Sequence, residues 1–356
     1  MKTFIFGINH KTASIEIREQ LFLNPLQQDL FLSELKSYPH VSEAMVLSTC
    51  NRTEVYLRAW HSSQLFEDLL QLISRIKKMP LAEELKQHFY YLEDREATRH
   101  LFRVTSGLDS LVLGEKQIIG QVKMAVDRAR AQSMMGKYFN ILSNVAIRTG
   151  KKAQTETDIS CGGSSVSWAA IRKAEQILGT LSGRSLLIIG AGKMGELTLK
   201  QIRNKGAKNI YLMNRTGTAA QTLAETCQAI PVSFEDIKET LSEVDICVCA
   251  ANAPHFILDK KMIEKIMALR QNRALILIDI SMPRNIDPLV GGIERVTLFH
   301  IDNLQSVVQE NMLRRQNAVA QVQAMIEDKI QDFYVKISKL KSSPQMSEFL
   351  DSSKNY

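Results

Sequence analysis

A glycine-rich turn after a short apolar run places the strongest constraint on the fold of this chain. Residues 186–189 are all Leu or Ile, and the spacing G-x-G-x-x-G follows in Gly190, Ala191, Gly192, Lys193, Met194 and Gly195. Between a strand and a helix, the first glycine permits a tight turn, the second lets a pyrophosphate approach the backbone, and the third allows close helix packing. The motif predicts a dinucleotide site. A glycine turn without a ligand is the alternative.

Alternating strand and helix patterns surround this turn. Strands are predicted at 185–189, 209–213, 245–250, 274–279 and 297–301, so the fold class is α/β with a doubly wound, Rossmann-type parallel sheet. The second strand is followed by Asn214, Arg215 and Thr216. A guanidinium and a hydroxyl suit a 2′-phosphate, and no carboxylate is present to bind a free 2′-hydroxyl. We therefore expect NADP(H) rather than NAD(H).

The N-terminal part follows a different order. Strands are predicted at 3–8, 43–49, 53–58 and 89–92, with helices at 25–37 and 63–78, and this β-α-β-β-α-β order is typical of a ferredoxin-like α+β unit. Further helices are expected at 94–106, 118–133, 138–155 and 166–179. We expect an N-terminal domain at 1–158, a nucleotide-binding domain at 159–301, a long linking or dimerisation helix at 302–341 and a polar tail at 342–356.

The long C-terminal helix is predicted to begin at Asp302, whose side chain can cap it. Apolar residues recur at three-to-four spacing with one interruption at Arg315; they are Val308, Met312, Val319, Val322, Ile326, Phe333, Ile337 and Leu340. A helix of this length cannot bury its stripe on one compact domain. We therefore expect it to pack on another chain or to span domains.

Composition narrows the class of protein. The five cysteines are scattered without a C-x-x-C pair, which favours a reduced, cytoplasmic protein over a disulfide framework. We expect no membrane span and no secretion signal, because no apolar run is suitable. Cys247 and Cys249 are interpreted as core residues, and we predict no metal site. Lysine plus arginine number 45 against 38 acidic residues, which permits an anionic partner.

The segment Ser48-Thr49-Cys50-Asn51-Arg52 suggests the chemistry. The apolar run at 44–47 predicts a strand that delivers Cys50 to a loop, where Arg52 is expected to lower the thiol pKa and favour the nucleophilic thiolate. A thiol and a hydride donor in one chain indicate reduction or oxidation at the acyl level, through a thioester. His10, His100 and the loop at 107–117 are further candidates, for which packing or connecting roles are the alternatives.

With these residues described, the chain resembles glutamyl-tRNA reductase over residues 3–340. The motifs are GINHKTA at 7–13, STCNRTE at 48–54, HLFR at 100–103, the segment 107–120, the glycine turn with 214–216, and DISMPRNI at 279–286. The family reduces glutamyl-tRNA(Glu) with NADPH to glutamate-1-semialdehyde, the first step of the five-carbon route to 5-aminolevulinate and tetrapyrroles. The resemblance implies that Cys50 is the nucleophile and that His100 assists near the thiol. It also implies a glutamyl pocket made of Thr49, Asn51, Arg52, Ser110, Glu115, Lys116, Gln117 and Gln121.

Two features depart from the family pattern. Lys116 stands where the family often has proline, so we expect a less rigid loop there. The family's dimer pairs through a helical domain beyond a long linking helix, whereas one helix and a short tail remain here. The resemblance implies a homodimer and docking with glutamate-1-semialdehyde aminotransferase.

Two other functions stay open. A shikimate-dehydrogenase-like NADP oxidoreductase acting on a small hydroxy acid would have no use for Cys50. A non-catalytic regulator would bind glutamyl-tRNA without turnover. The tRNA-binding surface is not identified; the candidate basic residues, for which a solvated helix face is the alternative, are Arg128, Arg130, Arg148, Lys151 and Lys152.

Overall fold

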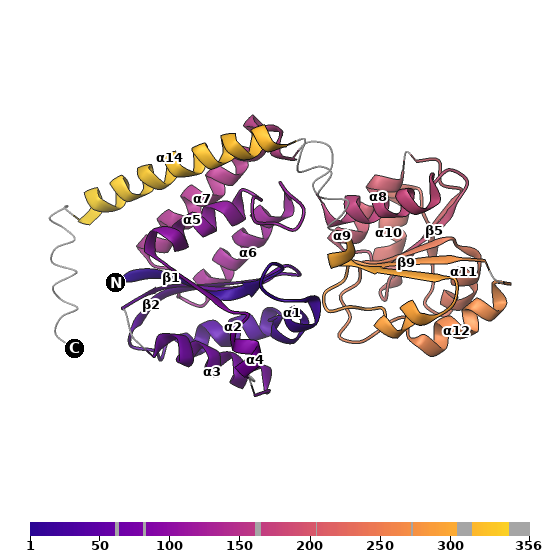
Figure 1. Cartoon of the computed structure of the whole chain (residues 1–356), viewed down its shortest axis with the longest axis horizontal. Helices are drawn as coiled ribbons and strands as arrows, with labels where there is room; N and C mark the ends of the chain where they lie inside the picture. Colours follow the sequence, from indigo (N-terminus) through magenta and orange to yellow (C-terminus); the bar gives the residue numbers. More distant parts are fainter. Residues whose placement is uncertain are drawn as a thin grey trace. The chain divides into compact units, whose positions relative to one another are not determined.

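Two parts of the chain fold as separate units in the computed structural model, which describes residues 1–60, 64–80, 83–160, 165–203, 205–271, 273–304 and 315–341 (Figure 1). The first unit combines Met1–Cys161 with Arg314–Tyr356, and the second comprises Gly162–Leu313. The described helices include none that is long and apolar enough to cross a membrane.

The first unit is built on a four-stranded antiparallel sheet. Its strands β1 (Lys2–Asn9), β2 (Val41–Ser48), β3 (Arg52–Ala59) and β4 (Tyr90–Glu93) lie in the order β2-β3-β1-β4. Helices α1 (Ile15–Leu21) and α2 (Pro25–Leu35) connect β1 to β2, and α3 (Leu65–Lys77) and α4 (Glu83–Lys86) lie between β3 and β4. This order confirms the predicted ferredoxin-like unit, to which α1 and the short α4 are unforeseen additions.

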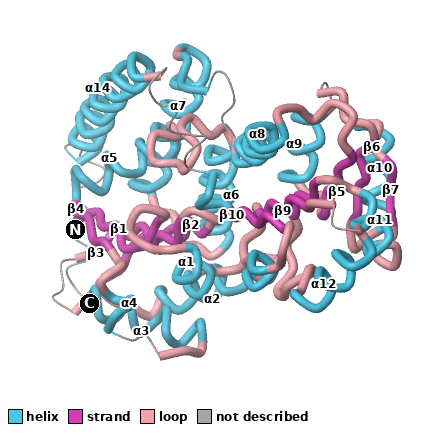
Figure 2. The backbone as a smooth tube through the Cα atoms, turned by 45° about the vertical axis from the view of Figure 1, so that its right-hand side comes forward, coloured by secondary structure: helices cyan, strands magenta, loops and turns pink. Residues whose placement is uncertain are grey.

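Helices cover both faces of this sheet. Figure 1 and Figure 2 show α1–α4 on one face and α5 (Asp94–Thr105), α6 (Gln117–Ala131) and α7 (Lys137–Glu156) on the other. Seven of the eight residues of β1 are therefore buried, rather than alternate residues only. A strand covered on both faces consists mainly of apolar residues, and a charged residue inside it requires a partner.

The C-terminal helix α14 (Gln316–Lys341) belongs to the first unit. Its apolar stripe enters the same core as β1 through Val322, Ile326, Ile330, Phe333 and Ile337. The helix packs on α5 and α7. The expectation that this stripe packs on another chain or spans domains is therefore wrong for the described part of the helix, because α5 and α7 present a matching apolar surface.

The predicted start of the long helix also differs. Ile301–Leu304, which includes Asp302, forms a short 3-10 helix, η3. Val308 and Met312 lie outside the described residues. Arg315, predicted as an interruption of the stripe, is buried and donates hydrogen bonds to the carbonyls of Leu113 (2.8 Å) and Ile159 (3.1 Å). It therefore fastens the start of α14 to the loop between α5 and α6.

The second unit is a doubly wound parallel sheet, as predicted. Its strand order is β10-β9-β8-β5-β6-β7, and the strands are β5 (Ser185–Ile189), β6 (Asn209–Met213), β7 (Ile230–Val232), β8 (Ile246–Cys249), β9 (Leu275–Asp279) and β10 (Val296–His300). The order reverses between β5 and β8, and such a reversal opens a crevice at the carboxyl ends of the strands. The sequence prediction missed β7, a three-residue edge strand that contains Pro231.

Helices cover both faces of this sheet as well. α8 (Val166–Leu178), α9 (Lys193–Ile202) and α10 (Gly217–Cys227) lie on one face, and α11 (Ile237–Glu243) and α12 (Lys260–Leu269) lie on the other (Figure 1). Cys247 and Cys249 are fully buried in β8, as predicted. A 3-10 helix, η2 (Pro288–Gly292), precedes β10.

Candidate active site

Cys50 stands at the tip of the hairpin between β2 and β3. The three residues 49–51 connect the strands, and the Thr49 amide donates to the Arg52 carbonyl (2.8 Å). The Cys50 carbonyl accepts from Nε of Arg18, which is buried on α1 (3.2 Å), and the Cys50 residue is half-buried. The predicted apolar strand thus delivers Cys50 to a tight turn that α1 holds in place.

The Arg52 guanidinium is bonded to two acidic residues, Glu54 and Asp109. The residues Arg52, Glu54 and Tyr56 alternate on β3 and so share one face of the sheet. Nη1 of buried Arg52 donates to Glu54 (2.6 Å) and to Asp109 (3.0 Å), and Nη2 donates to the Asp109 carbonyl. Two carboxylates therefore balance one guanidinium.

Glu54 collects hydrogen bonds at the centre of this network. It accepts from Tyr56 and Tyr90, and His100 on α5 approaches it with Nε2 at 2.8 Å. Burial alone would raise the pKa of Glu54, but the charges of Arg52 and His100 hold it below its usual range. The structure therefore places His100 against Glu54. Among the described residues, no hydrogen bond or ion pair joins His100 to Cys50.

The electrostatic environment corrects one expectation about Cys50. Burial, and next the negative charge of Glu115, raise the pKa of the Cys50 thiol to about 12, and Arg18 and Arg52 offset only part of this. Arg52 does lower the pKa of the Cys50 thiol, as predicted, but the expectation that its charge favours the thiolate is wrong for the free protein, because burial and Glu115 raise this pKa by more. Glu54 and Asp109 already compensate the charge of Arg52, and desolvation of the sulfur dominates.

Residues 107–115 form a buried loop that connects α5 to α6. Gly107 and Gly114 adopt positive φ angles of 72° and 74°, and the Gly114 amide donates to the Gly107 carbonyl (2.9 Å). A Cβ on Gly114 would lie 2.0 Å from the Ile159 carbonyl oxygen, so no larger residue fits. This closed loop turns Asp109, Ser110 and Glu115 inward, and all three are buried.

Burial also tunes two titratable groups near the hairpin. Desolvation raises the pKa of Glu115 to about 7, so this carboxyl exchanges its proton near neutral pH. Desolvation and the Arg52 charge lower the pKa of His10 to about 4, so its ring is neutral at pH 7. Lys116 is exposed at the start of α6, and Gln117 and Gln121 follow on that helix.

Several buried polar atoms around Cys50 have no hydrogen-bond partner among the described residues. They belong to predicted site residues or their neighbours: His10 Nδ1, Asn51 Oδ1, Arg52 Nε, Ser110 Oγ and Gln117 Nε2. Each such atom costs about 1–3 kcal/mol when it stays unpaired, so native structures hold few of them. Their concentration just after β1, in the hairpin, in the buried loop and at the start of α6 indicates a site that a polar ligand completes.

Sequence reasoning missed part of this network. Glu54, Tyr56, Tyr90 and Asp109 were given no role, and Lys11, which pairs with Asp109, was also passed over. A signal for Glu54 was present, because a carboxylate inside an apolar strand requires a compensating cation. Asp109 carried no comparable signal, since its partner lies 57 residues away in the sequence.

The glycine turn of the second unit has the predicted shape. Gly190 adopts a φ angle of 115°, and a Cβ there would lie 2.5 Å from the Ala250 carbonyl oxygen. A Cβ on Gly195 would lie 1.9 Å from the Gly190 carbonyl oxygen, so α9 packs closely on the turn. Around Gly192, at the N-terminus of α9, the space is open. These are the three roles that the motif predicts.

The residues after β6 complete this cradle. Asn214 accepts a hydrogen bond from the Ala191 amide (3.2 Å) and donates one to the Thr216 carbonyl (3.1 Å), which joins the two loops. Arg215 and Thr216 are exposed. Lys193 forms a surface ion pair with Glu196 (3.1 Å), and the Met194 carbonyl accepts from Ser167 (3.1 Å).

Comparisons with known proteins agree with both units. Residues 6–157 match the family model described as glutamyl-tRNAGlu reductase, N-terminal domain, and residues 172–307 match shikimate / quinate 5-dehydrogenase. The glutamyl-tRNA reductase of Citrifermentans bemidjiense is 37% identical over 97% of this chain and 79% of its own length. That of Syntrophus aciditrophicus is 36% identical over 98% and 83%.

The chain belongs to the glutamyl-tRNA reductase family. The solved structure of glutamyl-tRNA reductase from Methanopyrus kandleri is 32% identical, with a TM-score of 0.52 over 95% of this chain and 81% of that one. The chain is thus an oxidoreductase, and its second unit is a dehydrogenase-type domain for a nicotinamide cofactor. Within the described residues, no group of three or more His, Cys, Asp and Glu side chains is placed to hold a metal ion.

Proposed function

We propose that this chain reduces the glutamyl ester of glutamyl-tRNA(Glu) to glutamate-1-semialdehyde, through a thioester on Cys50 and with NADPH as reductant. Membership of the glutamyl-tRNA reductase family supports the reaction. The observation that carries the assignment of the site is the set of unpaired buried polar atoms around the Cys50 hairpin. A polar amino acid ester satisfies such atoms, whereas a purely structural turn would not retain them.

The second unit fits the cofactor. The tight packing of Gly195 against the turn and the open backbone at Gly192 leave room for a pyrophosphate at the N-terminus of α9. Asn214 fixes the loop that carries Arg215 and Thr216, and these two side chains are free to hold a 2′-phosphate. This supports NADPH over NADH. When bound there, the cofactor supplies the hydride that reduces the acyl group.

The glutamyl group finds complementary atoms in the first unit. Asn51 Oδ1 is an acceptor that suits the α-ammonium, whereas Arg52 Nε and Gln117 Nε2 are donors that suit the side-chain carboxylate. Arg52 offers only Nε, because Glu54 and Asp109 occupy its Nη atoms. Arg52 thus offers the substrate a single donor, and Ser110 Oγ supplies another.

The attack on the ester requires that Cys50 lose its proton. Glu115 accepts this proton in our proposal, because its negative charge is felt by the Cys50 thiol and its own pKa is about 7. The Cys50 sulfur then bonds to the acyl carbon, the bond to the terminal ribose oxygen breaks, and that oxygen leaves with a proton as the tRNA hydroxyl. The cofactor, when bound, would supply a hydride to the acyl carbon, and together with a proton this would give a hemithioacetal on Cys50, whose C–S bond breaks to release the aldehyde and the free thiol.

Three finer points rest mainly on the resemblance. We propose a homodimer and docking with glutamate-1-semialdehyde aminotransferase. We also propose a cytoplasmic location, which the free cysteines Cys50, Cys227, Cys247 and Cys249 support.

The test is NADPH oxidation by the purified protein, followed by absorbance, with glutamyl-tRNA(Glu) as substrate. Cys50→Ser should remove most of the turnover and leave NADPH binding intact, whereas the matched variant Cys227→Ser, which alters a buried thiol of the second unit, should behave like wild type. Near-normal turnover by Cys50→Ser would refute the assignment of Cys50 as the nucleophile. Turnover of a small hydroxy acid with NADP, but not of glutamyl-tRNA, would support the shikimate-dehydrogenase-like alternative.

A further inference from the structure

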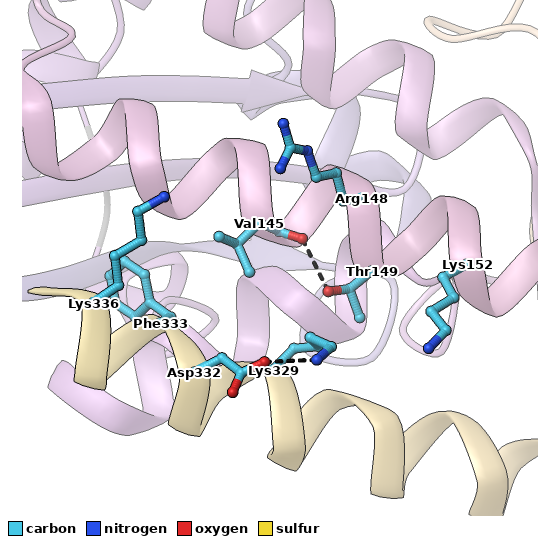
Figure 3. A pocket seen from close by; sticks show the side chains of 8 residues that line it. All are labelled: Val145, Arg148, Thr149, Lys152, Lys329, Asp332, Phe333 and Lys336. Carbon is cyan, nitrogen blue, oxygen red and sulfur yellow. Dashed lines mark hydrogen bonds and ion pairs between the residues drawn. The ribbon is translucent and has the colours of Figure 1, made fainter.

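A basic groove lies between α7 and α14 in the unit that carries Cys50. Its cavity of about 250 Å³ is lined by the apolar side chains of Val145 and Phe333 and by four cations (Figure 3). Two of these cations stand on α7 and two on α14: Arg148, Lys152, Lys329 and Lys336. Among the described lining residues, Asp332 is the only acid.

Three of the four cations are available to an anion. Lys329 is bonded to Asp332 (2.6 Å) and Asp328 (2.9 Å), as Figure 3 shows for Asp332, so its charge is compensated. Lys152 faces Glu156 at 3.5 Å across an exposed helix surface, and such a pair contributes little. Arg148 and Lys336 are exposed and form no ion pair with any described residue.

Two of the other basic candidates in this unit, Arg128 and Arg130, are engaged in the fold. Arg128 on α6 donates to Asp29 (2.7 Å) and to the Pro25 carbonyl (2.9 Å). Arg130 bonds to Asn140 and Asp127. These two arginines join helices to one another. The groove cations therefore differ from them in having no such structural task.

Both walls of the groove are fastened to the loop that carries Ser110 and Glu115. On α7, Gln154 Nε2 donates to the Glu115 carbonyl (3.5 Å). Directly before α14, Arg315 donates to the Leu113 carbonyl (2.8 Å). Arg148 precedes Gln154 by six residues, which is about 9 Å along a helix axis. On α14 the first lining residue, Lys329, follows Arg315 by 14 residues, which is about 21 Å along a helix axis, so the groove lies roughly 10–20 Å along the two helices from the active-site loop.

We propose that the α7–α14 groove binds the phosphate backbone of the acceptor arm of glutamyl-tRNA. The inference rests on the proposed function, because the acylated 3′ end must reach Cys50 while the rest of the arm stays outside the buried site. Arg148, Lys152 and Lys336 then contact successive phosphates close to that end. Such contacts release counterions from the RNA, so they supply affinity that falls with salt and do not affect the chemical step.

The test uses a fluorescently labelled, uncharged tRNA(Glu) transcript and a variant with Arg148→Ala, Lys152→Ala and Lys336→Ala. We expect the dissociation constant from anisotropy to rise at least about tenfold, and the slope of its logarithm against log salt to fall by about 2 to 3. A matched variant, Lys36→Ala with Lys208→Ala and Lys238→Ala, removes the same charge from exposed sites outside the groove and should bind as wild type.

Steady-state kinetics separate docking from chemistry. The groove variant should raise the KM for glutamyl-tRNA with kcat within about twofold of wild type, and it should keep the thermal midpoint and NADPH affinity of wild type. A charge-conserving variant, Arg148→Lys with Lys152→Arg and Lys336→Arg, should restore tRNA binding. If the groove variant and the matched variant had equal tRNA affinity and equal salt slopes, the assignment of the α7–α14 groove as the tRNA-binding site would be refuted. Failure of the wild type to oxidise NADPH with glutamyl-tRNA would instead overturn the proposed function.

Discussion

Cys50 should be alkylated at pH 8 about fifty times more slowly than a solvent-exposed cysteine. With a pKa of about 12, about one Cys50 thiol in 10⁴ is ionised at that pH, against roughly a quarter for a free cysteine with a pKa of ~8.5. This deficit is roughly 2,000-fold. A more basic thiolate is also more nucleophilic, and a Brønsted slope of about 0.4–0.5 recovers roughly 40-fold over this pKa difference.

The assay is pseudo-first-order alkylation with iodoacetamide in the absence of substrates, with glutathione as the exposed reference. Mass spectrometry assigns the label to the peptide that contains Cys50. The rate should rise about tenfold per pH unit between pH 7 and pH 10, because the whole range lies below the pKa of Cys50. A plateau near pH 8, or a rate equal to that of glutathione, would refute the argument that burial and Glu115 keep the resting thiol protonated.

Glu115→Gln extends this prediction with two effects of opposite sign. Removing the carboxylate charge lowers the pKa of Cys50, so alkylation should become faster. The same change removes the proposed proton acceptor, so turnover of glutamyl-tRNA should become slower, by about 10²–10⁴-fold for a general base. An increase in both rates would exclude Glu115 as the acceptor.

Three further predictions concern the ion network and the nucleotide cradle. Glu54→Ala should lower the free energy of unfolding by about 3–5 kcal/mol in urea titrations, because Arg52 stays buried with one carboxylate fewer. Since the folded pKa of Glu54 is depressed, this stabilisation should be complete well above its unfolded pKa of ~4.3 and decline as the pH falls below that value. An equal difference between wild type and variant at pH 3 and pH 7 would contradict this. Gly195→Ala should abolish NADPH binding by fluorescence through its clash with the Gly190 carbonyl, whereas Gly192→Ala, which meets open space, should keep the fold and only weaken binding; normal binding by Gly195→Ala would refute the packing argument. Arg215→Ala should weaken NADPH by about 1.5–3 kcal/mol and leave NADH nearly unchanged, and equal weakening of both would defeat the 2′-phosphate assignment.

The sequence predicted best where the signal is local. The observed bounds of β5 and β6, Ser185–Ile189 and Asn209–Met213, are those predicted, because an apolar run and a following glycine or polar turn define both ends. The order of β1–β4 also followed from local patterns. β7 did not, since a three-residue edge strand with Pro231 has little pattern to detect.

Long-range contacts account for what the sequence could not predict. Proximity along the chain suggested that Arg52 acts on Cys50, but Asp109 and Glu54 compensate its charge, and desolvation of the thiol outweighs it. The apolar stripe of α14 was correctly located, but its partner surface on α5 and α7 is distant in the sequence. Tyr334 on α14, for example, shares a hydrogen bond with Thr98 on α5, which lies 236 positions earlier. Periodicity identifies the face of a helix, and it does not identify what covers that face.

The most direct test of the account is to trap the acyl group on Cys50. The protein is incubated with glutamyl-tRNA(Glu) in the absence of NADPH, quenched in acid and examined by intact and peptide mass spectrometry. The account predicts a mass increase of one glutamyl group on the Cys50 peptide, removable by hydroxylamine and absent from Cys50→Ser. Turnover with NADPH by a protein that never acquires this adduct would contradict the thioester route.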